Sequence, residues 1–479
     1  MKRKAKIVAT LGPASDSEAI LEQLILAGMN VARLNFSHGS HKGHAARIEK
    51  LRRLSKTLKR SVGILQDLQG PKIRVGNLDA PLMLNNGEEV CFHAEGETPP
   101  SSTCKHIPVD FQELFETVHA GDTMLLDDGK LTMRVLNVHG QSLQAEVVVG
   151  GALTSHKGIN LPGVQIGISG YTEKDKIDLQ FGVEHSVDAV AVSFVRSAED
   201  VIEVREEMER FAKGFPAPML IAKLERPEAI EHLDAILDAV DGVMVARGDL
   251  GVEMPPERVP VLQKMIIEKA SQKAKLVITA TQMLETMIHN PLPTRAEASD
   301  IANAIFDGTD AVMLSAESAA GEYPVRSVEM MERIILEAES HSGTWGRVME
   351  RRLSLGNSDA ASMSRAAREL ANDDDVSAVA VFTSQGNTAW LVSKIRPPKR
   401  ILAFTPTEMT YHKLSFLWGV YPQLVPFAHS LEEMIGYVDA ALLKHGVREG
   451  EQVVVLCGFP VGSLTQPNMA LLHTVGEAS

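Results

Sequence analysis

The chain has 479 residues, of which 44% are hydrophobic and 23% are charged, a composition typical of a folded globular protein with a large core. At roughly 150 residues per domain, this length predicts about three domains and argues against one. The excess of 62 acidic over 48 basic residues gives a net charge of −14, which makes nucleic acid an unfavourable partner.

The N-terminal region and the cysteines indicate the cellular setting. The basic start MKRKAK is followed by a segment too short and too polar for a signal peptide, and no apolar run is long enough to span a membrane. Cys91, Cys104 and Cys457 are widely separated and lack the spacing of a metal site. We therefore expect a cytoplasmic protein with reduced cysteines and no membrane partner.

Eight short apolar runs alternate with longer helical patterns, which is typical of parallel βα units. Eight such units predict a TIM (β/α)8 barrel, although an open doubly wound sheet would give the same local pattern. The expected strands cover residues 6–12, 31–36, 62–67, 188–194, 218–225, 241–248, 275–282 and 310–317.

After the third apolar run, the alternation of strand and helix patterns is interrupted by a segment with only strand and turn patterns. Hairpin-type dipeptides at Asn86-Gly87, Asp128-Gly129 and His139-Gly140 separate β-branched runs, which predicts a small antiparallel β-barrel domain over residues 71–170. Loops that follow barrel strands lie at the end where active sites form. This insertion is therefore placed to act as a lid.

The pattern changes again towards the C-terminus. After a linker, apolar runs at 376–382, 400–405, 421–427 and 451–457 alternate with helical patterns, which predicts an open α/β domain. The expected domains are thus a barrel at 1–70 and 171–342, an inserted domain at 71–170 and a C-terminal domain at 343–479.

Charged side chains occur at the ends of the fifth and sixth expected strands. Lys223 and Glu225 are two residues apart, so the pleat directs both to the same side. Asp249 follows the next strand, and a Glu–Asp pair on adjacent strands suits Mg²⁺ while leaving coordination positions for substrate. Gly248 permits close approach of a ligand to the backbone. A structural ion pair and loop-capping acids would give the same local pattern.

The second expected strand also carries polar residues. Arg33, Asn35 and Ser37 alternate along RLNFSHG and face one way at the top of a barrel strand, where polar groups favour a ligand site over core. Three nearby histidines lack a further metal ligand, and we interpret them as a loop followed by a helix start: His38, His41 and His44.

Three further features lie later in the chain. Thr281 ends the seventh expected strand and could contribute a hydroxyl, whereas Thr294 and Glu297 have the spacing of a structural capping box. In the C-terminal domain, TSQGNT at 383–388 joins a strand to a helix. Its hydroxyls and amides form a generic phosphate cradle, which an ordinary turn would resemble.

Nine motifs, taken in chain order, resemble the pyruvate kinase family. They are TLGPAS, RLNFSHG, DLQGPKIR, KGINLPG, AKLERPEA, MVARGDLGVE, ITATQMLETM, PTRAEASD and DGTDAVMLSAESAAGEYP. They span residues 10–324 with family-like spacing, and the C-terminal domain matches more loosely. The resemblance implies a bacterial-type enzyme that transfers the phosphoryl group of phosphoenolpyruvate to ADP, giving pyruvate and ATP in the last step of glycolysis.

The resemblance also assigns roles to residues at the barrel end. Glu225 and Asp249 would hold Mg²⁺ or Mn²⁺, and a second Mg²⁺ would arrive with the nucleotide. Lys223 and Arg33 would offset charge on the transferring phosphoryl group. Backbone N–H groups of Gly248 and Asp249 would bind the substrate carboxylate.

Protonation and nucleotide binding complete the implied site. Thr281 would lie near the carbon that is protonated to give pyruvate. The residues implied to bind the nucleotide are Asn35, Phe36, Ser37, His38, Arg74 and Lys157.

One departure from the family concerns K⁺. Many members bind K⁺ with oxygens matching Asn35, Ser37, Asp67 and a threonine, and carry glutamate at the position of Lys72. Here Leu68 replaces that threonine. Because the Lys72 ammonium could supply the charge that K⁺ supplies elsewhere, we expect a K⁺-independent enzyme.

Regulation and assembly follow from the same resemblance. The turn formed by Thr383, Ser384, Gln385, Gly386, Asn387 and Thr388 is expected to bind the phosphate of an allosteric activator. The later loop CGFPVGSLTQ offers no cation for a second phosphate, which favours a sugar monophosphate or a nucleotide. A homotetramer is implied. Two alternatives are another metal-dependent lyase that handles phosphoenolpyruvate or pyruvate, and a non-catalytic phosphometabolite sensor.

Overall fold

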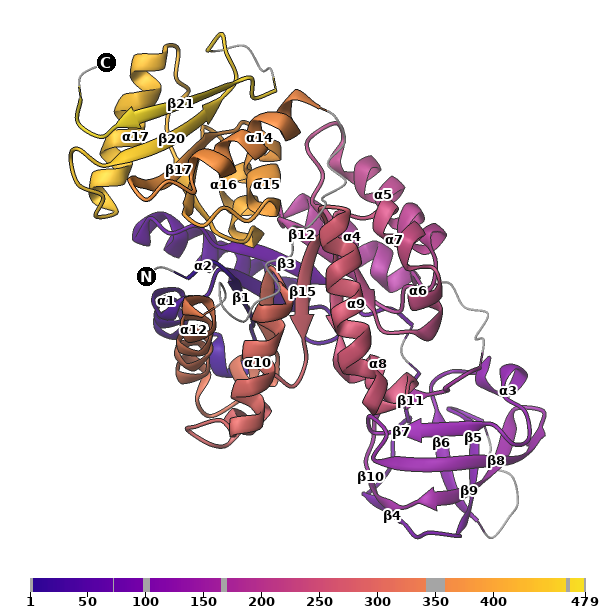
Figure 1. Ribbon diagram of the computed structural model, residues 1–479. Coiled ribbons are helices and arrows are strands. Elements are labelled where there is room, and N and C mark those ends of the chain that lie inside the picture. The colour runs from indigo at the N-terminus through magenta and orange to yellow at the C-terminus, as the bar shows by residue number, and fades with distance from the viewer. Residues whose placement is uncertain are drawn as a thin grey trace.

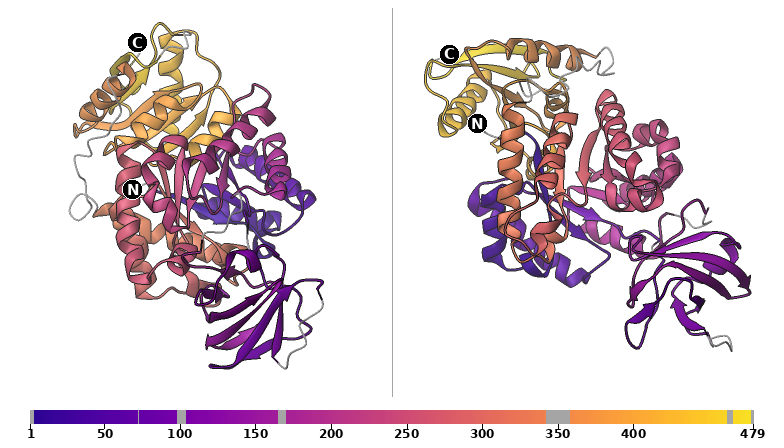
Figure 2. Two further views of the ribbon diagram at one scale, coloured as in Figure 1. Left: turned by 90° about the vertical axis from the view of Figure 1, so that its right-hand side faces the viewer. Right: turned by 60° about the horizontal axis from the view of Figure 1, so that its bottom comes forward.

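The computed structural model describes residues 3–71, 73–97, 104–164, 170–341, 358–461 and 466–477. A closed barrel occupies the middle of the molecule, with the inserted β structure at one end and the C-terminal sheet at the other (Figure 1). Two further views give the same arrangement (Figure 2). No helix within the described ranges is both long and apolar enough to cross a bilayer.

The barrel is formed by eight parallel strands in the order β1-β16-β15-β14-β13-β12-β3-β2. Each predicted apolar run contains one of them, so the barrel is confirmed and the open sheet is excluded. Parallel strands covered on both faces are buried along their length, which explains the continuous apolar runs. The strands are β1 (Lys6–Thr10), β2 (Val31–Asn35), β3 (Gly63–Asp67), β12 (Ala189–Val192), β13 (Met219–Leu224), β14 (Gly242–Ala246), β15 (Leu276–Ala280) and β16 (Ala311–Leu314).

Helices with well-defined ends surround the barrel. Thr294 caps α10 and forms the predicted capping box with Glu297, while left-handed Gly28 and Gly308 end α1 and α10. The helices are α1 (Glu18–Ala27), α2 (His41–Leu58), α4 (Glu173–Glu184), α5 (Ala198–Ala212), α6 (Pro227–Glu231), α7 (Leu233–Ala239), α8 (Arg247–Glu253), α9 (Val259–Gln272), α10 (Arg295–Asp307), α11 (Ala316–Ala319) and α12 (Pro324–Ser340). Short 3₁₀ turns are η1 (Pro13–Ser15), η2 (Pro256–Arg258) and η3 (Glu285–Ile288).

The inserted structure is a six-stranded sheet in the order β11-β7-β8-β9-β5-β6, with a separate β10-β4 pair. Residues 74–75 bridge both edges, because Arg74 pairs with Gly158 beside β11 and Val75 pairs with Val109 of β6. These bridges connect the two edges of the sheet, so the sheet approaches the closed form of the small β-barrel that the sequence predicted. Its elements are β4 (Leu82–Leu84), β5 (Glu89–Ala94), β6 (Lys105–Val109), α3 (Leu114–Thr117), β7 (Thr123–Leu126), β8 (Leu131–His139), β9 (Ser142–Val149), β10 (Gly151–Leu153) and β11 (Ile159–Asn160).

Two of the three predicted hairpins occur. Asp128-Gly129 joins the antiparallel pair β7 and β8, and His139-Gly140 marks the turn from the end of β8 to the antiparallel strand β9. The hairpin predicted at Asn86-Gly87 is wrong, since β4 pairs with β10 and β5 pairs with β9 and β6. The expectation of a purely antiparallel domain is also wrong, because β5 and β6 are parallel. A turn dipeptide indicates a reversal but does not choose the pairing partner.

The cysteine prediction requires a correction as well. Cys91 and Cys104 form a disulfide, and their sulfurs lie with His106 in a potential metal-ligand group. Their separation of 13 residues suggested no contact, but the parallel pairing of β5 and β6 brings the two positions together. Cys457 is a buried free thiol.

The C-terminal sheet has the order β19-β18-β17-β20-β21. Four of its strands coincide with the predicted runs, whereas β21 was missed; it pairs antiparallel with β20 at the sheet edge. The strands are β17 (Val376–Phe382), β18 (Arg400–Thr405), β19 (Val420–Leu424), β20 (Gln452–Cys457) and β21 (Met469–Thr474). The helices are α14 (Asp359–Leu370), α15 (Asn387–Lys394), α16 (Glu408–Lys413) and α17 (Leu431–Lys444), with the 3₁₀ turn η4 (Leu414–Phe416).

The C-terminal sheet region docks on the amino ends of the barrel strands. The buried Asp310, just before β16, accepts from Lys394 at 2.6 Å and from Arg396 at 2.7 Å. Trp390 donates its indole N–H to the carbonyl of Ala274 at 2.8 Å. Phe416 is buried against Gly63, the first residue of β3, where a Cβ would come within 2.5 Å of the Phe416 ring. The C-terminal region thus covers the amino ends of the barrel strands, and their carboxyl ends lie on the opposite side of the barrel.

Candidate active site

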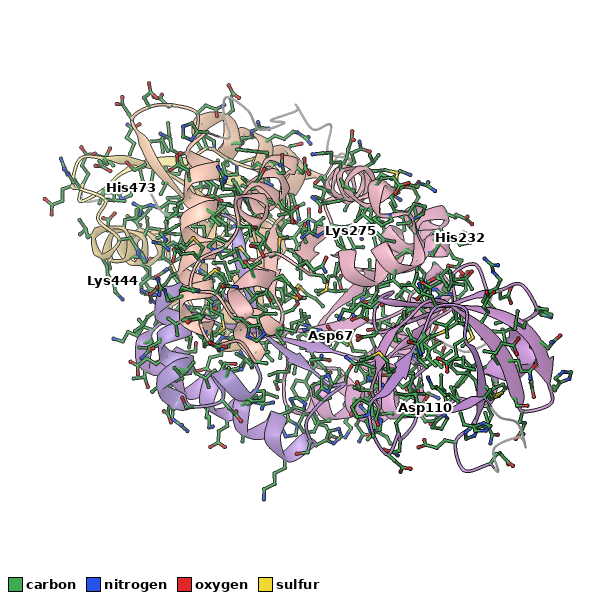
Figure 3. All side chains as sticks on the ribbon, turned by 90° about the horizontal axis from the view of Figure 1, so that it is seen from below. Asp67, Asp110, His232, Lys275, Lys444 and His473 are labelled. Atoms are coloured by element: carbon green, nitrogen blue, oxygen red, sulfur yellow. A yellow bond between two sulfur atoms is a disulfide. The ribbon has the colours of Figure 1, made fainter. Side chains whose placement is uncertain are left out.

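A cluster of charged side chains joins the carboxyl ends of three barrel strands. Lys223 on β13 lies 2.8 Å from Glu225 and 3.4 Å from Asp67, the last residue of β3. Arg33 on β2 lies 2.6 Å from the other oxygen of Asp67. Figure 3 places Asp67 on the part of the barrel next to the inserted domain, which carries Asp110. The structure therefore brings together Arg33, Lys223 and Glu225, as the sequence predicted.

The charges in this cluster are strongly coupled. Burial alone would raise the pKa of Asp67, but Lys223 and Arg33 outweigh it and hold the pKa below its usual value. Burial opposes the charge on Lys223, yet Asp67 and Glu225 raise its pKa. The ammonium is therefore kept charged at the barrel end, and both oxygens of Asp67 already face cations.

Glu225 is the carboxylate that best fits a metal ion. Burial raises its pKa, and Asp249 raises it further despite the opposing effect of Lys223. The backbone N–H of Phe194 donates to Oε2 of Glu225 at 2.8 Å, which orients the carboxylate. A buried carboxylate whose charge is opposed by burial and by a neighbouring acid is a donor that a divalent cation would stabilise. The pair Glu225 and Asp249 thus fits Mg²⁺ chemically.

Thr281 and Gly248 approach each other closely beside this pair. Thr281 has φ of 76° and Gln282 has φ of 55°, a conformation that β-branched residues rarely adopt and that concentrates at functional sites. Arg247 holds this backbone by donating to the Thr281 carbonyl at 2.7 Å and pairing with Asp300 at 2.7 Å. A Cβ on Gly248 would lie 2.7 Å from Cγ2 of Thr281. A side chain at 248 would therefore force Thr281 to shift.

The predicted nucleotide residues of the barrel continue from the end of β2. Asn35 accepts from the backbone N–H of Ser37 at 3.1 Å, which folds the turn that leads to His38. The carbonyl of Phe36 accepts from Lys174 at 2.8 Å. His41 and His44 lie in the first turn of α2, as the loop-and-helix interpretation predicted.

The two predicted cations of the inserted structure lie near one another. Arg74 pairs in a backbone bridge with Gly158, the residue after Lys157. Lys157 forms an ion pair with Asp127 at 2.7 Å, and Arg74 donates to the carbonyl of His156 at 3.4 Å. Among the described residues, no hydrogen bond or ion pair joins either cation to the Lys223 cluster. The predicted Lys72 lies outside the described residues.

The predicted effector turn borders a cavity in the C-terminal region. Gly386 has φ of 95° and caps α15, and its N–H donates to Oγ1 of Thr383 at 2.9 Å. The cavity, about 340 Å³, is lined by five of the six predicted residues, namely Thr383, Ser384, Gln385, Asn387 and Thr388. The stacked rings of Phe382 and Phe404 form part of its apolar wall. No lysine or arginine occurs among the described residues that line it.

Sequence reasoning missed several residues that organise the barrel end. Lys223 donates to Ser193 at 2.7 Å, and Ser193 donates to the Leu68 carbonyl at 2.7 Å. Thr10 accepts from Arg33 at 2.9 Å. Both hydroxyls end or follow a barrel strand, so a search for polar residues at all eight strand ends would have found them. The role of Asp67 as the common partner of Arg33 and Lys223 was also missed.

Comparison with known proteins agrees with this geometry. The family models described as "Pyruvate kinase, barrel domain" and "Pyruvate kinase, alpha/beta domain" match residues 2–328 and 361–473. A pyruvate kinase of Agrobacterium vitis is 45% identical over 97% of both chains. Those of Sporosarcina psychrophila and Geobacillus stearothermophilus are 44% and 43% identical, over 99% and 100% of this chain and 81% of each relative. The chain therefore belongs to the pyruvate kinase family of phosphotransferases.

Proposed function

We propose that this protein transfers the phosphoryl group of phosphoenolpyruvate to ADP at the carboxyl end of the barrel, producing pyruvate and ATP. The observation that carries this proposal is the buried cluster of Arg33, Lys223, Glu225 and Asp67, in which two cations stand beside a carboxylate suited to a metal. Phosphoryl transfer needs positioned positive charge more than covalent chemistry, and the cluster supplies it.

Each side chain of the cluster has a distinct task. Lys223, held by Asp67 and Ser193, stabilises negative charge on the transferring phosphoryl group and the enolate oxygen. Arg33 clamps the phosphoryl group. Glu225 and Asp249 hold Mg²⁺, which when bound offsets substrate charge, and Mn²⁺ suits the same oxygen donors.

The carboxylate and the methylene carbon of the substrate lie on the side of Gly248. Backbone N–H groups of Gly248 and Asp249 receive the carboxylate, because no side chain obstructs them at position 248. Thr281, fixed in its left-handed conformation, orients the water that delivers a proton to the methylene carbon.

ADP binds between the barrel and the inserted domain. Asn35, Phe36, Ser37 and His38 line the barrel side, while Arg74 and Lys157 contact the phosphates. Lys157 exchanges Asp127 for phosphate when the inserted domain, residues 71–170, closes as a lid over the barrel domain of residues 1–70 and 171–342.

The test of this activity is ADP-dependent formation of pyruvate. Purified protein with phosphoenolpyruvate, ADP and Mg²⁺ is expected to give pyruvate and ATP in equal amounts. Consumption of phosphoenolpyruvate without ADP would instead indicate a lyase, and no consumption with intact folding would indicate a sensor. Either result would overturn the proposal.

We also propose that turnover does not require K⁺. The oxygens of Asp67 that match the K⁺ pocket already face Arg33 and Lys223, and Asn35 accepts from Ser37. Leu68, which is buried, offers no hydroxyl. The assay with a bulky organic cation as the only monovalent salt is expected to give full activity, and a collapse that K⁺ reverses would contradict this.

The C-terminal domain, residues 343–479, serves as the effector domain. The cavity beside Thr383 and Thr388 offers hydroxyls for one phosphate and apolar walls for a sugar or base, without a cation among its described lining residues for a second phosphate. A sugar monophosphate or a nucleotide is therefore expected to reduce the sigmoidal response to phosphoenolpyruvate. Activation by fructose bisphosphate alone would contradict this. The enzyme is expected to be a cytoplasmic homotetramer, which analytical ultracentrifugation can test for assembly.

A further inference from the structure

Two Cys-x-His pairs stand side by side in the inserted domain. Cys91 and His93 belong to β5, and Cys104 and His106 lie just before and within β6. The two strands are parallel neighbours, with Cys91 in register with His106. Residues two apart on a strand point to the same face, so each pair presents one sulfur and one imidazole together. Phe92, between Cys91 and His93, and the flanking Val90 and Ile107 belong to the apolar core on the other face.

The donor atoms of this cluster are already close. Both sulfurs and a ring nitrogen of His106 lie within 4.8 Å of one another, and no other His, Cys, Asp or Glu group in the described part of the chain meets this criterion. Donors around a tetrahedral zinc ion with two sulfurs and two nitrogens are roughly 3.4–3.8 Å apart. For these three donors the present spacing needs only small shifts of the side chains, apart from separation of the two sulfurs, and His93 is the neighbouring imidazole that would complete the set.

A hydrogen bond fixes the orientation of the His93 imidazole. Nδ1 of His93 lies 3.0 Å from the carbonyl oxygen of Ala94, and because a carbonyl only accepts, this nitrogen carries the proton. In the neutral ring Nε2 of His93 is then the atom with the free lone pair, as in metal sites where the second ring nitrogen donates to a carbonyl. The His93 ring centroid is 6.0 Å from that of His106.

His106 supplies an independent indication. Its Nδ1 is enclosed by protein, yet it has no hydrogen-bond partner among the described residues. A buried polar atom without a partner is unfavourable, and a bound metal ion is one way to satisfy it. Cys91 is 2% and His93 is 8% exposed, whereas Cys104 and His106 are half-buried, so the site is shielded from solvent on the side of β5.

We propose that the inserted domain, in its reduced form, binds one Zn²⁺ through Cys91, Cys104, His106 and Nε2 of His93. Two thiolates balance the charge of the ion, and an S₂N₂ donor set favours zinc over the oxygen-preferring Mg²⁺. This site is separate from Glu225 and Asp249, and the proposal does not depend on the catalytic one.

The disulfide and the metal are alternative states of this site. A dithiol reductant passes two electrons and two protons to the Cys91–Cys104 bond and itself becomes a disulfide. Zn²⁺ then replaces the two thiol protons, which are released to solvent. An oxidant of the disulfide class reverses the sequence: it accepts the two electrons from the thiolates and two protons from solvent to become a dithiol, the sulfurs of Cys91 and Cys104 reform their bond, and Zn²⁺ leaves.

Cobalt titration of the full-length protein tests the proposal. Reduced protein, freed of reductant and kept in excess Mg²⁺ to occupy oxygen-ligand sites, is expected to bind one equivalent of Co²⁺ with a sulfur-to-cobalt charge-transfer band that Zn²⁺ abolishes. The oxidised wild-type protein is expected to give no band. Absence of the band from the reduced protein, or its presence in the oxidised protein, would overturn the proposal without reference to any variant.

Variants then identify the ligands. Cys104→Ser and His106→Ala, checked for folding by circular dichroism, are expected to lose the band or weaken cobalt binding at least tenfold. Cys457→Ser is the matched control, because Cys457 is a buried thiol of the C-terminal sheet, and it is expected to keep the band. A band that persists in folded Cys104→Ser, or that disappears in Cys457→Ser, would contradict the assignment.

Discussion

The two ends of the barrel each contain a buried aspartate held by a lysine and an arginine. Asp67 at the carboxyl end binds Lys223 and Arg33, and Asp310 near the amino end binds Lys394 and Arg396. In both cases burial would raise the aspartate pKa, and the two cations lower it. The charge motif is therefore the same at both ends.

The surroundings of the two motifs differ. Lys394 is 3% exposed and sealed against Trp390 of the C-terminal region, and it donates to the Lys275 carbonyl. Lys223 is 12% exposed, and it also faces a second acid, Glu225, whose pKa is raised. A buried ion pair by itself does not identify a catalytic site. The second acid beside the pair, Glu225, is what sets the carboxyl end apart from the amino end.

The sharpest test of this comparison is Lys223→Met, which removes the ammonium and keeps most of the side-chain length. We expect kcat to fall by roughly 10³-fold, because stabilisation of transition-state charge is lost while the barrel stays folded. Steady-state kinetics with circular dichroism measure both properties. Near-normal turnover in a folded variant would contradict the assignment of a catalytic role to the Asp67 cluster and not to the Asp310 cluster.

Lys394→Met makes the same change at the other end. It leaves the buried Asp310 with Arg396 alone, and removal of one partner of a buried pair costs about 3–5 kcal/mol. Calorimetry should therefore show a lower Tm, with kcat at saturating substrate little changed. A loss of kcat equal to that of Lys223→Met, with unchanged Tm, would show that the two motifs have been assigned the wrong roles.

Gly248→Ala tests the geometry of the carboxyl end more finely. The new Cβ would lie 2.7 Å from Cγ2 of Thr281, so we expect kcat/KM for phosphoenolpyruvate to fall by about tenfold or more. Thr281→Ser removes that methyl group. The double variant should therefore recover activity relative to Gly248→Ala, which double-mutant kinetics can measure. Additive losses would contradict the steric explanation.

A smaller effect is expected from pH at the amino end. Burial lowers the pKa of His412 to about 3 from 6.5, and Arg52 adds to the shift. A depressed folded-state pKa means that stability is fully present above 6.5 and is lost as pH falls towards 3. Between pH 6.5 and 5.5 this loss is roughly 1 kcal/mol.

His412→Gln should flatten this part of the stability profile in denaturant titrations. The control is His289→Gln, because His289 is 77% exposed and should leave the profile unchanged. A wild-type slope in folded His412→Gln would exclude the buried histidine as its cause.

The barrel was predictable because strand burial produces continuous apolar runs, and the number of runs distinguished it from an open sheet. The strand-end residues Arg33, Lys223 and Glu225 were predictable because a barrel gathers such ends in one place. Their mutual contact with Asp67 was not, since sequence spacing does not give the register between β2, β3 and β13.

The inserted domain was predicted less well. Local turn signals gave two hairpins but not the parallel pairing of β5 with β6, which depends on contacts distant in sequence. Because this parallel pairing was not predicted, the contact between Cys91 and Cys104 was not predicted either. Strand β21 was missed because an edge strand near the end of a chain has no βα alternation to mark it.

Strand β3 connects the two ends that differ so much. It begins at Gly63, where Phe416 leaves no room for a side chain, and ends at Asp67, which holds Arg33 and Lys223. An insertion or deletion of one residue in these five positions would either displace Phe416 or turn the aspartate to the opposite face of the strand. The length of β3 is therefore under constraint from both ends, and among barrel strands it should be among the least tolerant of length variation.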